Sequence, residues 1–144
     1  MKKITFVLLL MLCAVCSSAQ HGKFSPQQFE ADLQKFIAKE ARLTPKESAR
    51  FFPVYTELCR KKRVIFEKIR NYRHSKPATD DECKKVIQKT DELDLQIKEL
   101  ERQYHNKFLK ILPAGKVYDI LKAESRFHRQ ALKKAGNRFG KKKR

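Results

Sequence analysis

The chain has 144 residues, of which 41% are hydrophobic and 35% charged, and its 34 Lys and Arg against 16 Asp and Glu give a net charge of +18. This length is enough for one domain. The sequence contains no glycine-rich phosphate loop and no serine or cysteine placed beside a histidine as a nucleophile–base pair, so we expect neither an enzyme nor a cofactor.

The first segment, residues 1–19, is predicted to be a secretory signal peptide. Two lysines precede an apolar run over residues 4–15, and small residues end the segment. The run has about 12 residues, whereas a helix that spans a membrane needs about 20. We therefore expect a mature chain of residues 20–144, exported to the periplasm.

The charge of the mature chain then suggests its partners. It keeps 32 basic residues against 16 acidic ones, a net charge of +16. An exported protein rarely meets nucleic acid, so we expect no nucleic acid as a partner. Unfolded or acidic polypeptides, or an anionic envelope surface, are the expected partners instead.

Three helix starts share one chemistry, the capping box, in which a hydroxyl caps the first turn and Gln or Glu three residues later reaches back. Their sequences are Ser25-Pro26-Gln27-Gln28, Thr44-Pro45-Lys46-Glu47 and Thr79-Asp80-Asp81-Glu82. They predict helices near 26–41, 45–73 and 80–111. Pro113 cannot continue the third helix, and a fourth is expected to follow it and end near Gly136. The predicted fold class is all-α with four helices, and residues 20–135 form one helical domain.

The second and third predicted helices carry apolar stripes. The second has Phe51, Tyr55, Leu58, Ile65, Ile69 and Tyr72, widened by Phe52, Cys59 and Phe66. The third has Val86, Thr90, Leu93, Ile97, Leu100, Tyr104 and Ile111. Spacings of three and four residues predict a coiled-coil-like antiparallel hairpin across residues 74–78. A helix of 30 residues is about 45 Å long, so we expect an elongated protein that forms a homodimer or holds a client on one face.

The hairpin also bears on the two cysteines of the mature chain, Cys59 and Cys83. Reflecting the chain about Lys76 places Cys83 opposite Ile69, which is about 15 Å from Cys59. That separation is too large for a disulfide within one chain. A disulfide between two chains stays open.

A short motif resembles a known family. The sequence Leu43-Thr44-Pro45-Lys46-Glu47 opens a long basic amphipathic helix and resembles the LTxxQ motif of the periplasmic Spy/CpxP-like proteins, with Glu in place of the final Gln. Those relatives carry a second motif before the last helix, where Leu112-Pro113-Ala114-Gly115-Lys116 keeps only the leucine. The resemblance implies a curved antiparallel dimer that acts as an envelope-stress chaperone or adaptor without ATP. Leu43, Thr44 and Glu47 would be structural residues.

Basic and aromatic side chains on the second helix predict a client-binding face. The candidates are Arg60, Lys61, Arg63, Phe66, Arg70, Tyr72 and Arg73. Charge attracts unfolded or acidic polypeptides over a distance, and the rings then contact apolar side chains. In the alternative reading, Asp91, Glu92 and Asp94 of the third helix run beside residues 60–63 and neutralise them.

Two other functions compete with this one. A metal-responsive sensor would use Glu124 and His128, which lie on one helical face, but two ligands are too few unless Cys59 or a dimer mate completes the set. The sequence favours a buried Glu124 that pairs with Lys62 or an arginine. A structural protein would bind anionic envelope surfaces through residues 133–144, with a flexible basic tail from residue 136. The sequence does not identify the client or a signalling partner.

Overall fold

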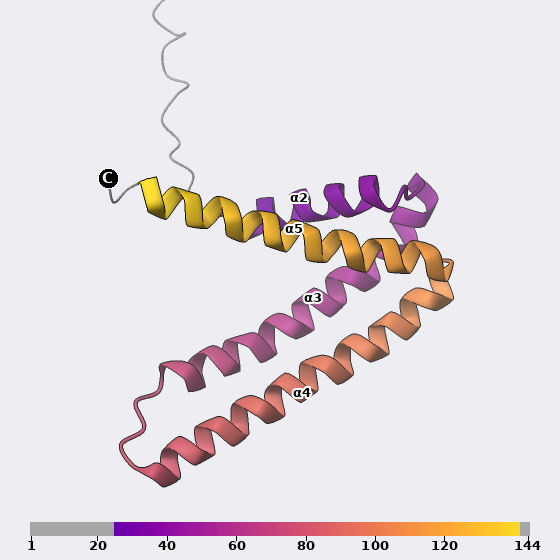
Figure 1. Ribbon diagram of the computed structural model, residues 1–144. Helices are drawn as coiled ribbons and strands as arrows, with labels where there is room; N and C mark the ends of the chain where they lie inside the picture. The colour runs from indigo at the N-terminus through magenta and orange to yellow at the C-terminus, as the bar shows by residue number, and fades with distance from the viewer. Residues whose placement is uncertain (1–24, 142–144) are drawn as a thin grey trace, which may run out of the picture. The chain divides into compact units, whose positions relative to one another are not determined.

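The computed structural model describes the chain from residue 25 to residue 141, with side chains as far as residue 137. All regular secondary structure in this part is helical: α2 (Pro26–Glu40), α3 (Pro45–His74), α4 (Asp80–Ile111) and α5 (Ala114–Lys141) (Figure 1). The predicted all-α fold with four helices is thereby confirmed for the described residues. None of these helices is both long and apolar enough to span a membrane. The predicted signal peptide lies outside the described residues.

The chain divides into two compact units between Ala31 and Asp32, within α2. The described part of the first unit is residues 25–31, where the Gln28 N–H donates to the Ser25 hydroxyl at 3.3 Å. The second unit contains the rest of α2 and the other three helices.

Helices α3 and α4 begin at complete capping boxes, as predicted. The Glu47 N–H donates to the Thr44 hydroxyl at 3.2 Å, and the Thr44 N–H donates to the Glu47 carboxylate at 2.8 Å. Thr79 and Glu82 make the same reciprocal pair at the start of α4. Each box satisfies two backbone donors that the first turn of a helix leaves without a partner.

The link from α2 to α3 is a tight turn at Arg42. The Leu43 N–H donates to the Ala38 carbonyl at 2.9 Å, and the Arg42 N–H donates to the Lys39 carbonyl at 3.2 Å, which is the Schellman arrangement. Arg42 has a φ of 49°, in the left-handed region that favours glycine. Leu43 packs on the core directly after this turn, so the predicted motif ends one helix and starts the next.

Helix α5 continues to Lys141, so the prediction that it ends near Gly136 is wrong. Glycine costs about 1 kcal/mol relative to alanine inside a helix, which weakens a helix without stopping it. Gly136 has no positive φ, and nothing lies within 4 Å of the place where a Cβ would stand.

The main core lies where the second part of α2, the start of α3, the end of α4 and the first half of α5 meet. Its buried residues are Leu33, Ile37, Ala41, Phe51, Tyr55, Leu58, Tyr104, Phe108, Leu112, Val117, Ile120 and Ala123. The rings of Phe51 and Phe108 are 4.8 Å apart at their centroids and join α3 to α4. Phe36 and Phe127, 5.5 Å apart, join α2 to α5. Burying one such side chain contributes about 1.5–3 kcal/mol.

The loop-side half of α3 is held against α4 by a smaller cluster, in which Ile69 packs against Leu93 and Ile97. This contact shows that the predicted register, which placed Cys83 opposite Ile69, is wrong. Reflection about the loop assumed that both helices end at the same level. Instead α3 packs against residues further along α4, and the first turns of α4 extend past the end of α3 (Figure 1).

Candidate functional site

The predicted client-binding residues lie on two different sides of α3. At about 100° per residue, five of them share an arc of roughly 140°. These five residues, which we call the arginine face, are Arg60, Arg63, Phe66, Arg70 and Arg73. Lys61 and Tyr72 lie on the opposite flank of the stripe that packs against α4.

The arginine face combines exposed cations with an exposed ring. Phe66 is 50% exposed and lies between arginines in the helical order. Arg60, Arg70 and Arg73 are exposed and make no ion pair within the described residues. Their guanidinium groups are therefore accessible to carboxylates of another molecule.

The surroundings of Lys61 and Tyr72 differ from those of the arginine face. The Lys61 Nζ lies 2.9 Å from the Glu57 carboxylate and 5.3 Å from the centroid of the Tyr104 ring, so its charge is already engaged. The ion pair with Lys61 is the largest cause that lowers the pKa of Glu57. Tyr72 was predicted to belong to the buried stripe, but it is 38% exposed because it lies near the end of α3, beyond the cluster around Ile69.

The expectation that Asp91, Glu92 and Asp94 neutralise residues 60–63 is wrong. Glu92 pairs within α4 with Lys89, at 2.6 Å. The carboxylate that lies opposite this part of α3 is that of Glu101.

Lys62 Nζ lies 2.5 Å from Glu101 across the hairpin, and Lys98 Nζ lies 2.9 Å from the same carboxylate. Burial of Glu101 acts to raise the pKa of its carboxyl, but the hydrogen bonds from Lys62 and Lys98 outweigh it and hold the pKa below its usual value. Glu101 thus pairs with Lys62 of α3 and does not neutralise the arginine face.

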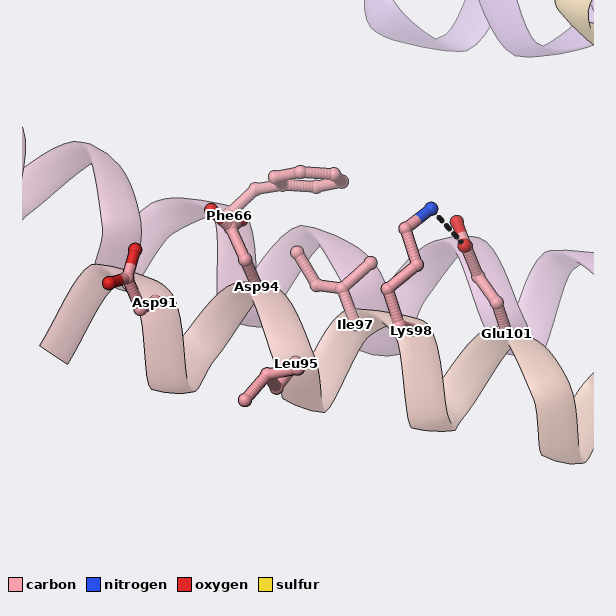
Figure 2. Close-up of a pocket in the computed structure, with 7 residues that line it drawn as sticks. All are labelled: Phe66, Asp91, Asp94, Leu95, Ile97, Lys98 and Glu101. Atoms are coloured by element: carbon pink, nitrogen blue, oxygen red, sulfur yellow. Dashed lines mark hydrogen bonds and ion pairs between the residues drawn. The ribbon is translucent and has the colours of Figure 1, made fainter. Parts of the chain in front are cut away.

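A groove with a volume of about 640 Å³ runs beside this face. It is lined by Phe66, Asp91, Asp94, Leu95, Ile97, Lys98 and Glu101. In Figure 2 the Phe66 ring reaches from α3 over α4, on the side that carries Asp94 and Ile97, whereas Leu95 points away from the ring. Asp91 and Asp94 are exposed and make no ion pair within the described part of the chain. This groove was not predicted from the sequence, although the near-neutral charge of residues 77–112 indicates that α4 differs from α3.

The final residues of the two motif segments, Glu47 and Lys116, contact each other. The Lys116 Nζ lies 2.5 Å from the Glu47 carboxylate and donates to the Arg42 carbonyl at 3.2 Å. The hydrogen bond from Lys116, followed by that from the Thr44 N–H, lowers the pKa of Glu47 to about 2. Glu47 and Lys116 thus join the starts of α3 and α5.

The two candidate metal ligands, Glu124 and His128, have different neighbours from those predicted. The Tyr55 hydroxyl donates to the Glu124 carboxylate at 2.9 Å, and the His128 Nε2 lies 3.9 Å from the same oxygen. The prediction that Glu124 pairs with Lys62 or an arginine is therefore wrong. Glu124 contacts Tyr55 and His128, and Lys62 pairs with Glu101.

Burial is the largest cause that raises the pKa of Tyr55, and the neighbouring Glu124 carboxylate raises it further. Within the described residues, no three His, Cys, Asp or Glu side chains gather closely enough to hold a metal ion. Within the described residues, neither Cys59 nor Cys83 forms a disulfide.

Comparisons with known proteins found no family model, no curated protein and no solved structure that matches this chain. Membership of the Spy/CpxP-like family therefore remains a prediction, based on Leu43, Thr44 and Glu47.

Proposed function

We propose that this chain is an exported, ATP-independent chaperone-like protein or stress adaptor, which binds unfolded or acidic polypeptides through the arginine face of α3. The observation that carries the proposal is a half-exposed Phe66 among arginines that include Arg60, Arg70 and Arg73, which make no ion pair within the described chain. A surface that offers cations and an apolar ring together suits an unfolded chain, which presents both acidic and apolar side chains.

Capture begins with electrostatic attraction. Attraction between exposed charges extends over about 8 Å at physiological ionic strength, so the excess positive charge favours acidic segments. Each guanidinium then makes paired hydrogen bonds to a carboxylate, and Phe66 covers an apolar side chain of the client. Release needs no chemical step, because these contacts are individually weak and salt-sensitive.

The test is light scattering of an acidic client, reduced α-lactalbumin, as it aggregates in the presence of the purified chain at several salt concentrations. We expect suppression at low salt that fades as salt rises. The variant Arg60→Glu with Arg70→Glu removes two cations of the face and is expected to lose most of the suppression.

The matched control is Lys68→Glu with Arg129→Glu, which changes the net charge equally at exposed positions outside the face. We expect this control to suppress aggregation nearly as well as the unmodified chain. Equal loss in both variants would mean that net charge alone acts. If the unmodified chain fails to suppress aggregation even in molar excess, the proposed function is wrong.

A further inference from the structure

One flank of the α3–α4 hairpin carries unpaired charges of both signs. On α3, Arg70 and Arg73 make no ion pair in the part of the chain that the structure describes, and on α4 the same is true of Asp91 and Asp94. Phe66 belongs to this flank too, because it lies on the arginine face and lines the groove together with both aspartates (Figure 2). The flank is therefore basic along one helix, acidic along the other, and apolar between them.

The contacts across the hairpin give the level of each residue. Lys62 pairs with Glu101, and Ile69 packs in one cluster with Leu93 and Ile97, which places it level with about residue 95. Because the helices are antiparallel, each step forward along α3 corresponds to one step backward along α4. Arg70 therefore lies level with Asp94, to within about one residue or 1.5 Å.

By the same count, Arg73 lies level with Asp91. Phe66 lies level with Ile97. The cations of α3 thus follow the same spacing along the hairpin as the carboxylates of α4, on opposite sides of the groove.

We propose that a second copy of this chain occupies the flank, related to the first by a two-fold axis parallel to the hairpin. That axis places α3 of one copy over α4 of the other at the same level. Arg70 then meets Asp94 and Arg73 meets Asp91 across the interface, and each pair occurs twice. Phe66 covers the Ile97 region of the other copy. The two hairpin tips lie side by side, in contrast to the antiparallel dimer that the family resemblance implies.

The charge pattern selects this occupant. A purely acidic partner that covered both helices of the flank, and not the arginine face alone, would lie against Asp91 and Asp94. A purely basic partner would lie against Arg70 and Arg73. Either arrangement costs free energy for every pair of like charges. The same surface turned about a two-fold axis satisfies both signs, as isologous interfaces require. Residues 91–101 span about 15 Å of helix, so the patch is smaller than a stable interface needs and the pair is weak and concentration-dependent.

This pairing covers part of the arginine face, so it competes with client binding. That consequence rests on the proposed function, whereas the pairing itself does not. A client that takes Phe66 and Arg70 must displace the second copy. The dimer is then a storage form whose client surface opens on dilution or when clients are abundant.

The experiment is sedimentation equilibrium of the full chain and two charge-reversed variants, without any client. Arg70→Glu with Arg73→Glu places like charges against the aspartates, and Asp91→Lys with Asp94→Lys does so against the arginines. We expect the dimer dissociation constant of each variant alone to be at least about tenfold higher than that of the unmodified chain. An equimolar mixture of the two is expected to recover association to within about threefold, because all four pairs are again of opposite sign.

Matched controls with equal changes of net charge are Lys68→Glu with Arg129→Glu, and Asp81→Lys with Asp119→Lys, at exposed positions outside the flank. Circular dichroism melting checks that each variant folds. A monomeric unmodified chain, or a mixture no better associated than its components, overturns the pairing. Because no client is present, either result leaves the proposed function to its own test.

Discussion

Replacing Tyr55 by phenylalanine removes one buried hydrogen bond and leaves the ring in place. The Tyr55 side chain is 1% exposed, and its hydroxyl donates to Glu124 of α5 at 2.9 Å. A hydrogen bond to a charged group contributes about 1.5–3 kcal/mol. The Glu124 side chain is 23% exposed, so water replaces part of the lost bond. We expect Tyr55→Phe to lower the free energy of unfolding by about 1–2 kcal/mol and the Tm by about 3–8 °C.

The assay is urea unfolding monitored by circular dichroism, with Tyr118→Phe as the control. Tyr118 is 65% exposed, so the same chemical change there is expected to alter stability by less than about 0.5 kcal/mol. In a double-mutant cycle, Tyr55→Phe and Glu124→Ala together are expected to cost less than the sum of the single changes. A loss at Tyr55 no larger than at Tyr118 would refute the reasoning.

The same pair predicts a pH dependence. Burial raises the pKa of Tyr55 above its usual value. Because the pKa is raised in the folded state, the contribution of the Tyr55 hydroxyl to stability is fully present below pH 10, the usual pKa of tyrosine. This contribution is lost as the pH rises above 10. The difference in stability between the unmodified chain and Tyr55→Phe is therefore expected to shrink between about pH 10 and pH 11.

Three further predictions concern stability. The pKa of Glu47 is lowered to about 2, so its contribution to the free energy of unfolding is present above about pH 4.5 and is lost towards pH 2. Glu47→Gln or Lys116→Gln should make the free energy of unfolding depend less on pH in this range. An unchanged pH dependence in either variant would contradict the contact. Ile97→Ala should cost about 2–4 kcal/mol, whereas Leu95→Ala, at a 70% exposed position, should cost less than about 0.5; equal losses in urea unfolding would argue against the small cluster. Arg42→Gly should stabilise the chain by about 1 kcal/mol because the φ of 49° suits glycine, and a lower Tm would contradict this.

Local chemistry made the helix starts predictable. A capping box is written within four residues, so the starts of α3 and α4 at Pro45 and Asp80 follow from the sequence alone. The apolar spacing also identified the buried faces of both helices. The end of α5 could not be located in this way, since Gly136 weakens a helix without ending it.

The hairpin register could not be read from the sequence, because it depends on how far each helix extends past the loop. A sequence gives the stripe that packs, but many offsets of two long stripes bury similar area. The pairing of Lys62 with Glu101 shows the actual offset between the two helices. With this offset Asp91 and Asp94 do not lie beside residues 60–63 but line the groove. The bond from Tyr55 to Glu124 joins residues far apart in the chain and was missed for the same reason.

The most direct test of the proposed function is photo-crosslinking of a denatured acidic client from a photoreactive phenylalanine analogue at position 66. The control is the same analogue at position 118, an exposed aromatic site on α5 outside the arginine face. We predict that the client crosslinks efficiently from position 66 at low salt, less at high salt, and only weakly from position 118. Equal crosslinking from both positions, or stronger crosslinking from position 118, would contradict capture of clients by the arginine face.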